Sequence, residues 1–175
     1  MTSAAALEKK SATALQAVQF VIERASLIKS LGHVQSVVEK RGTIPVLSNV
    51  KIETKDGFIE LTATDMELAV IERVPAEVSV AGATTVPAHM FYDIVRKLPE
   101  GAQVECATSA DAGKRTIRSG QSRFSLGCLP VDEFPVMADG ELPYNFTLKN
   151  ADCLSLIKKP SFAISHEETR YYLNG

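Results

Sequence analysis

Apolar residues recur at helical spacing in two stretches of the chain, and each stretch predicts an amphipathic helix. The first stripe consists of Leu27, Ile28, Leu31, Val34, Val37 and Val38. The second stripe, within 88–98, consists of Met90, Phe91, Ile94, Val95 and Leu98. Gly42 and Pro45 are expected to end the first helix, and Pro99 the second, because glycine and proline are poor helix formers.

Elsewhere, polar and apolar residues alternate in short runs, which is the two-residue period of a half-buried strand. Between two such runs, Asp56 and Gly57 form a dipeptide that is typical of a tight hairpin turn. Strands are expected at 19–22, 46–54, 58–64, 68–74, 77–80, 82–86, 103–107, 115–118 and 122–126. This order predicts an α+β fold of two similar β-α-β-β-β half-units with mostly antiparallel sheets.

The pattern at the start of the chain returns after a polar stretch rich in proline and glycine. Phe20, Ile22, Ala25, Leu27, Ile28 and Leu31 are matched, without a gap, by Phe146, Leu148, Ala151, Cys153, Leu154 and Ile157. We therefore expect an N-terminal extension at 1–18, a domain at 19–129, a linker at 130–143 and the start of a similar domain at 144–175. Because this second copy is too short to bury a core, we interpret the sequence as a fragment.

Charge and cysteine content narrow the possible classes of protein. The formal net charge is −2 and the pI is about 5.9, so any positive charge for DNA must be concentrated on one face. Cys106, Cys128 and Cys153 are widely spaced, which favours free thiols over disulfides or a zinc site. No apolar run is long enough to span a membrane. We expect a cytoplasmic protein without a metal or cofactor.

Asp65 and Glu67 are spaced so that both would point to one face of a strand, and such carboxylate pairs can bind a metal or act in acid–base catalysis. No histidine lies near them in the sequence, so the end of a polar strand is the favoured interpretation. The motifs GxSxG, GxxxxGK[ST] and HExxH are absent. Two alternatives stay open from the residues alone: a non-enzymatic DNA-binding regulator, and an α+β hydrolase that uses Asp65.

Five short segments together resemble the bacterial DNA sliding clamp, the beta subunit of DNA polymerase III. They are LTATD at 61–65, GATTVPA at 82–88, YDIVRKLPEG at 92–101, SRFSL at 122–126 and RYYLNG at 170–175. The resemblance implies a DNA clamp fold whose helices lie on one face of the sheets, toward the channel of a ring. Clamps of this family contain three such domains in each of two protomers, so this sequence would hold the first domain and the beginning of the second.

The resemblance also implies a function, that of a processivity factor of the replicative polymerase and not of an enzyme. A homodimeric ring would encircle duplex DNA irrespective of its sequence and slide along it. The implied partners are duplex DNA, a second protomer bound head to tail, the polymerase III alpha subunit and the clamp loader, with no membrane. No catalytic residues are expected.

A sliding ring must contact phosphates without reading bases, and long cationic side chains on helices suit this task. Arg24 and Arg96 are candidates on the predicted helices, although solvated helix faces contain similar residues. The resemblance adds Arg41, His166, Tyr171 and Tyr172 as DNA-binding residues. It also assigns Tyr172 and Leu173 to the edge of the pocket that binds partner peptides.

For the ring interface, the resemblance implies the second helix and its neighbouring edge strand. Apolar contacts would come from Ile94, Leu98 and Phe124. Cationic contacts to acidic residues of the partner would come from Lys114 and Arg123. The residues alone leave another interpretation open, because the apolar stripe of a helix often belongs to the core of its own domain.

Overall fold

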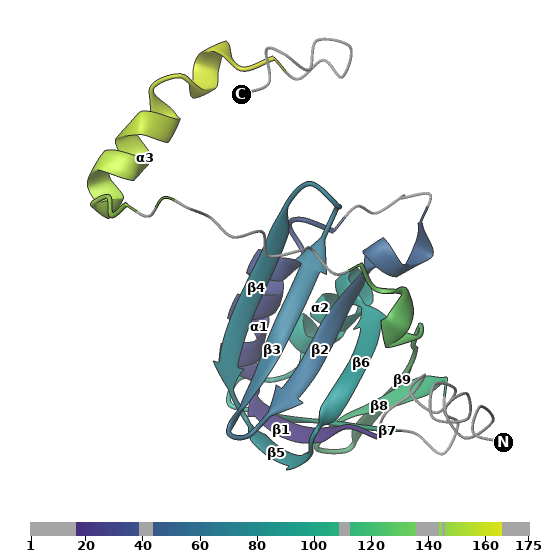
Figure 1. Ribbon diagram of the computed structural model, residues 1–175. Coiled ribbons are helices and arrows are strands. Elements are labelled where there is room, and N and C mark those ends of the chain that lie inside the picture. Colours follow the sequence, from purple (N-terminus) through teal and green to yellow (C-terminus); the bar gives the residue numbers. More distant parts are fainter. Residues whose placement is uncertain (1–16, 39–43, 109–112, 136–143, 145, 166–175) are drawn as a thin grey trace, which may run out of the picture. The chain divides into compact units, whose positions relative to one another are not determined.

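The computed structural model describes residues 17–38, 44–108, 113–135, 144 and 146–165 (Figure 1). The chain divides into two units, Met1–Met137 and Ala138–Gly175. Nearly all of the secondary structure belongs to the first unit. No helix in the described ranges is long and apolar enough to cross a membrane.

The first unit contains two similar series of elements. Its first half consists of β1 (Gln19–Glu23), α1 (Arg24–Val34), a 3-10 helix η2 (Pro45–Ser48), β2 (Asn49–Lys55), β3 (Phe58–Thr64), β4 (Ala69–Pro75) and β5 (Glu77–Val80). Its second half consists of β6 (Gly82–Pro87), α2 (Ala88–Lys97), β7 (Gln103–Thr108), β8 (Lys114–Ser119) and β9 (Ser122–Gly127), followed by a short 3-10 helix η3 (Val131–Glu133). The predicted α+β fold with two similar halves is confirmed.

The two halves exchange their first strands. The five-stranded sheet has the order β5-β1-β7-β8-β9, and the four-stranded sheet has the order β4-β3-β2-β6. Thus β1 pairs with β7 of the second half, while β6 pairs with β2 of the first half. All of these pairs are antiparallel, as the sequence predicted. The exchange makes the two halves one folding unit.

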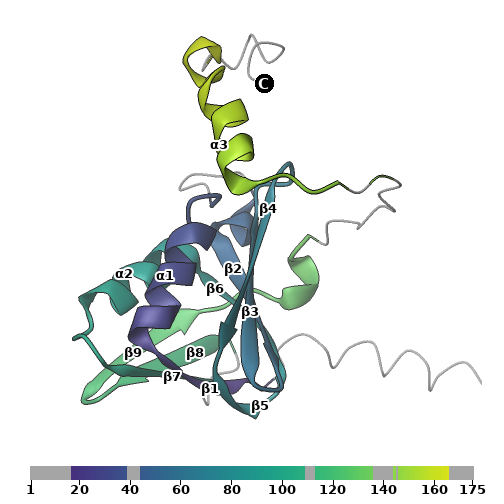
Figure 2. The same ribbon diagram turned by 90° about the vertical axis from the view of Figure 1, so that its left-hand side faces the viewer.

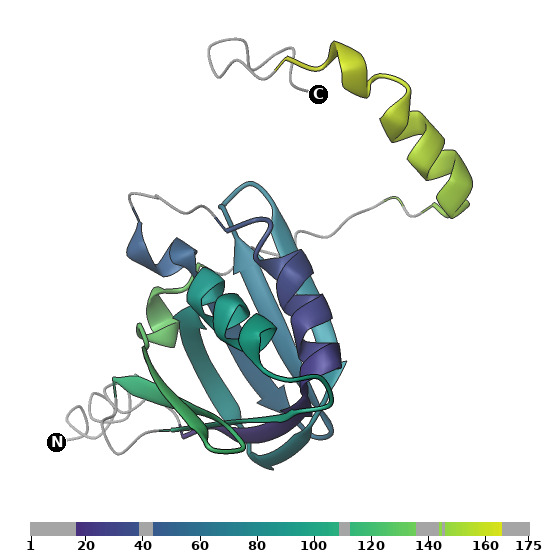
Figure 3. The ribbon, with the colours of Figure 1, turned by 180° about the vertical axis from the view of Figure 1, so that it is seen from behind.

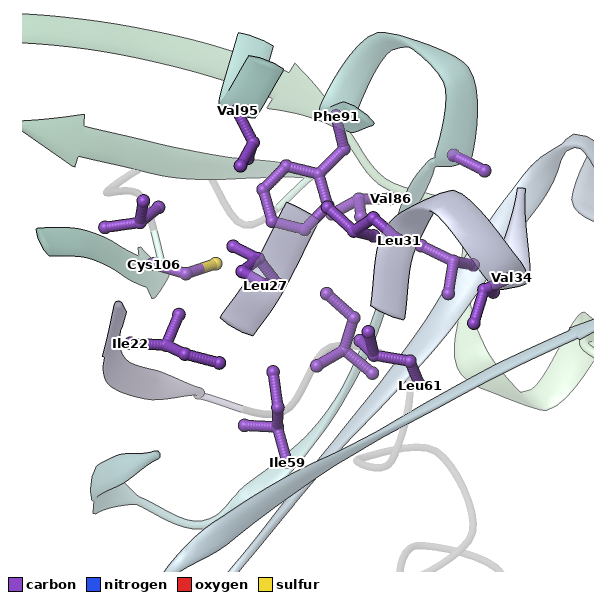
Figure 4. Packing of buried hydrophobic residues seen from close by; sticks show 14 of the residues in the cluster. Ile22, Leu27, Leu31, Val34, Ile59, Leu61, Val86, Phe91, Val95 and Cys106 are labelled. Atoms are coloured by element: carbon purple, nitrogen blue, oxygen red, sulfur yellow. The ribbon is translucent and has the colours of Figure 1, made fainter. Parts of the chain in front are cut away.

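Both helices lie side by side on the same side of the sheets (Figures 2 and 3). Leu27 and Leu31 of α1 and Phe91 of α2 point into a shared core, together with strand residues such as Ile59 and Cys106 (Figure 4). Each of these side chains is at most 1% exposed. Burial of one such large apolar side chain contributes about 1.5–3 kcal/mol relative to exposure, so this shared core fixes the position of both helices.

Three details of the sequence prediction were wrong. The strand expected at 46–54 begins only at Asn49, because Pro45 starts η2 and the Ser48 hydroxyl donates a hydrogen bond to the Pro45 carbonyl (2.6 Å). The first helix ends at Val34 and continues as turns up to residue 37. Met90, which we placed on the apolar stripe of α2, is 55% exposed and lies outside the core.

The second unit contains α3 (Asn150–Lys158) and a 3-10 helix η4 (Ser161–Ala163). A helix therefore stands where the sequence repeat places one, but residues 146–149 form no strand. The apolar side chains of Phe146, Leu154 and Ile157 are exposed. Repeat-derived strand residues need the other strands of a sheet, and none is present in the described part of this unit. The proposed division into domains stays a prediction.

Candidate assembly surface and DNA-facing helices

The strand β9 forms one edge of the five-stranded sheet and pairs on one side with β8. A tight turn joins the two strands, and its first residue, Gly120, has a φ of +55°, a conformation that glycine adopts without strain. The register places Phe124 opposite Ile117 and Arg123 opposite Arg118. Because neighbours along a strand point to opposite faces, Phe124 lies on the core side and Arg123 on the outer side.

A hollow of about 530 Å³ lies between the outer flank of α2 and β9. It is lined by His89, Met90, Asp93, Ile94, Lys97, Leu98, Pro99, Ser122 and Phe124. The structure therefore brings together Ile94, Leu98 and Phe124, the three apolar residues that the sequence assigned to a ring interface. Leu98 is only 7% exposed and also belongs to the core, whereas Ile94 and Phe124 are half-buried. Met90 joins this surface, and its helical spacing from Ile94 could have indicated the shared flank.

The cationic residues assigned to the interface lie on the outer face of the same sheet edge. Lys114 and Arg123 are both exposed. Arg118, which the sequence analysis missed, faces Arg123 directly across the β8–β9 pair and is also exposed. Like charges opposite each other on two strands are unfavourable by themselves. This arrangement therefore suits a surface that meets carboxylates of another molecule.

Arg24 and Arg96, the two helix arginines assigned to DNA, have different surroundings. The Arg24 Nε and Nη2 donate hydrogen bonds to the carbonyl oxygens of Val95 (3.1 Å) and Arg96 (2.9 Å). Arg24 thus satisfies carbonyls in the last turn of α2, which have no partner within the helix. The Arg96 side chain is exposed, pairs with Asp93 (3.1 Å) and lies 5.9 Å from the centre of the Tyr92 ring.

The remaining assigned residues, Arg41, His166, Tyr171, Tyr172 and Leu173, lie outside the described residues. His89 on α2 is engaged within the fold. Its Nε2 lies 3.0 Å from the carbonyl oxygen of Val38, so this contact ties the first turn of α2 to the segment after α1.

Asp65 has a structural position in the turn between β3 and β4. Its Oδ1 accepts hydrogen bonds from the backbone N–H groups of Leu68 (2.7 Å) and Glu67 (2.9 Å). These bonds hold the pKa of Asp65 below its ordinary value, and the bond from Leu68 has the largest effect. Met66, which lies between Asp65 and Glu67, adopts a φ of +83°. Among the described residues, no group of three or more His, Cys, Asp or Glu side chains is arranged to bind a metal. No geometry around Asp65 favours the hydrolase alternative.

Comparison with known proteins gives a consistent set of relatives. The family model of the DNA polymerase III beta subunit, N-terminal domain, matches residues 18–138. The beta sliding clamp of Caulobacter vibrioides is 47% identical over 157 residues, which cover 90% of this chain and 42% of the relative. The beta sliding clamp of Escherichia coli K12 is 41% identical over 158 residues, covering 90% of this chain and 43% of the relative.

Solved structures agree with these relatives. A crystal structure of the Caulobacter crescentus beta sliding clamp has a TM-score of 0.87 and 46% identity, covering 91% of this chain and 42% of that chain. A sliding clamp from Bartonella birtlesii, bound to griselimycin, has a TM-score of 0.86 and 43% identity, with the same coverage of 91% and 42%. The chain thus spans less than half the length of these relatives.

Proposed function

The chain belongs to the family of the DNA polymerase III beta subunit, N-terminal domain, and from this premise we propose that it is part of a sliding clamp. The clamp is a ring that encircles duplex DNA and keeps the replicative polymerase on its template. The chain acts as an accessory subunit of the polymerase, in the cytoplasm, and catalyses no reaction itself.

The observation that supports this function best is that α1 and α2 lie side by side on one side of the sheets. The helices of this layer carry exposed cations, among them Lys29 of α1 and Arg96 of α2. Because the chain as a whole has a net charge of −2, attraction to DNA would depend on such cations being presented locally. Contacts restricted to phosphates hold the duplex without pinning the ring at one sequence.

The hollow beside α2 supports the second part of the proposal, which is head-to-tail assembly. Ile94, Met90 and Phe124 offer an apolar recess to a side chain of the partner protomer. The cations Lys114, Arg118 and Arg123 pair with carboxylates around it. A heterologous contact of this kind generates a ring when the rotation between protomers closes.

The residues outside the described ranges enter the proposal by resemblance. Arg41, His166, Tyr171 and Tyr172 contact DNA. Tyr172 and Leu173 form the edge of the pocket that receives peptides of the polymerase alpha subunit and the clamp loader.

A chimera tests the proposal as a whole. In it, this chain replaces the matching 157 residues of the Caulobacter vibrioides beta sliding clamp, and the clamp loader of that organism places it on nicked circular duplex. We expect the chimera to co-elute with the circle in gel filtration and to be released when a restriction enzyme linearises the DNA. Equal retention on linear DNA would indicate direct binding by a regulator, and no retention on the circle would also contradict a ring.

A further inference from the structure

Two polar side chains on the outer face of the four-stranded sheet are buried. The register places Thr85 of β6 opposite Lys51 of β2, on the face that points away from the core. Asn49 lies on the same face at the start of β2. Thr85 is nevertheless 0% exposed and Asn49 only 3%. Because the hydrophobic core lies on the opposite face, another part of the chain must cover these two residues.

The cover is the segment that follows β9, residues 128–134, which we call the exit segment. Its η3 lies against β6, and Phe134 at its end is only 5% exposed. The Cys128 N–H donates to the carbonyl of Gly113 (2.8 Å), and the Phe134 N–H donates to the carbonyl of Val131 (3.0 Å). The chain therefore stays on the first unit beyond the end of its last strand.

One hydroxyl group links the exit segment to the sheet. The Thr85 Oγ1 accepts a hydrogen bond from the Leu129 N–H (3.0 Å) and donates one to the Leu129 carbonyl (2.8 Å). It accepts a further bond from the Asn49 Nδ2 (3.0 Å). A threonine hydroxyl has one proton to donate and two lone pairs, so these three bonds use its full capacity. Both backbone groups of Leu129 are thus satisfied by a single side-chain oxygen.

We propose that Thr85 is a positioning residue that fixes the exit segment, along which the chain leaves the first unit, in its place on β6. Burial of Phe134 holds the end of the exit segment without defining its register, and the Cys128 N–H bond to Gly113 ties its start to the beginning of β8 but not to β6. The paired bonds to Leu129 define the register, because a hydroxyl can satisfy an N–H and a carbonyl of one residue only in a narrow range of positions. The importance of this position for a ring rests on the proposed function, because successive units of a ring need a fixed connection.

Amide hydrogen exchange of the 175-residue chain, measured by NMR, tests the local part of the proposal. In Thr85→Val, which is nearly isosteric, the Leu129 amide should exchange at least about ten-fold faster, because its N–H loses its acceptor. Amides of β2 and β3 should keep their protection. Thr85→Ser retains the hydroxyl and should protect Leu129, and Thr85→Ala serves as a second variant without a hydroxyl. Thr62→Val is the matched control, since Thr62 occupies the same face opposite Lys51 and is half-buried.

Unchanged protection of Leu129 in both Thr85→Val and Thr85→Ala would overturn the proposal. Equal loss of protection throughout the sheet would do so as well, because Thr85 would then act only as a core residue. Retention of the chimeric ring on circular duplex tests whether a fixed exit segment matters for the ring. Thr85→Val should shorten the time for which the ring stays on the circle, and Thr62→Val should not. Retention unaffected by Thr85→Val would contradict the positioning role, whereas failure of the unmutated chimera to be retained would contradict the proposed function alone.

Discussion

The guanidinium group of Arg24, the first residue of α1, donates a hydrogen bond of 2.9 Å to the backbone carbonyl of Arg96 in the last turn of α2. A second bond joins it to the carbonyl of Val95 (3.1 Å). The backbone N–H of Arg24 also donates to the carbonyl of Ala102 (2.9 Å), just after α2. The start of one helix is thus fastened to the end of the other, and this contact aligns the two helices of the layer.

Replacement of Arg24 by methionine should therefore lower the stability of the unit. Methionine keeps an unbranched apolar stem, but two carbonyls at the end of α2 lose a charged donor, which should cost about 1–2 kcal/mol of unfolding free energy. Urea denaturation measures this change. Arg96→Met is the control, because the exposed Arg96 side chain contributes only a surface ion pair with Asp93 and a contact with the Tyr92 ring, and their loss should stay within about 0.5 kcal/mol. Equal effects of the two replacements would contradict the assigned role of Arg24.

Met90 should contribute to assembly and not to stability. It is 55% exposed on the flank of α2 that lines the hollow. Met90→Asp should leave the unfolding free energy within about 0.5 kcal/mol of the original, yet weaken self-association of the chimera by about ten-fold or more, because a carboxylate would have to be buried in an apolar contact. Sedimentation equilibrium measures the association.

Val80→Asp provides a control for Met90→Asp at the opposite edge of the five-stranded sheet. Val80 is an exposed apolar residue of β5, 37% accessible, and lies at the edge farthest in strand order from β9. Self-association should be unaffected by this change. If both replacements weakened association equally, a general effect of added negative charge would explain the result, and the hollow would lose its proposed role.

Local patterns predicted the elements of the first unit because each depends on neighbouring residues. The alternation at 58–64 predicted β3 with its observed bounds, and its alternate residues Ile59 and Leu61 face the core. The wrong strand start before Asn49 has an equally local cause, since Pro45 favours the first turn of a helix. Such errors change the boundary of an element but leave the fold intact.

The sequence patterns could not predict contacts between residues that lie far apart in the chain. Helical spacing grouped Met90 with Phe91, but a stripe cannot separate residues that face the core from those on a flank when the neighbouring helix is unknown. Arg24 was assigned to DNA as a cation on the first helix, and its bonds to the carbonyls of Val95 and Arg96 could not be predicted, because these residues lie more than 70 positions further along the chain. The hollow was not predicted, although the resemblance had assigned Ile94, Leu98 and Phe124, which line it, to a common interface.

The three cysteines should differ strongly in reactivity. Cys153 is exposed, Cys128 is half-buried and Cys106 is buried. Burial raises the pKa of the Cys106 thiol to about 12 and also raises the pKa of Cys128, so both contain less of the reactive thiolate near neutral pH. A thiol-reactive disulfide reagent should modify Cys153 first, Cys128 more slowly and Cys106 only after unfolding in denaturant. Cys153→Ser should remove the fast phase, and rapid labelling of Cys106 in the folded chain would contradict the described core.

The stability of the four-stranded sheet should depend on pH through Glu60, whose side chain is only 10% exposed. The Arg73 Nε donates a hydrogen bond to this carboxylate (2.8 Å), and the Lys55 Nζ donates another (3.0 Å). These two bonds hold the pKa of Glu60 below its ordinary value of 4.5, and the bond from Arg73 has the larger effect. A carboxyl group with a lowered pKa in the folded state stabilises it above the unfolded pKa, and this stabilisation is lost as the pH falls through the folded value.

Glu60→Gln should accordingly reduce the unfolding free energy at pH 7 by about 1 kcal/mol, a modest value because Arg73 and Lys55 are themselves largely solvated. The difference from the unmutated chain should shrink as the pH falls below 4.5, since the native carboxylate then becomes protonated as well. Urea denaturation at a series of pH values measures both curves. Glu100→Gln, in the exposed turn after α2, is the control and should give no comparable difference at pH 7. A constant difference between Glu60→Gln and the unmutated chain down to strongly acidic pH would mean that the amide disturbs packing, and that the two ion pairs do not stabilise the sheet.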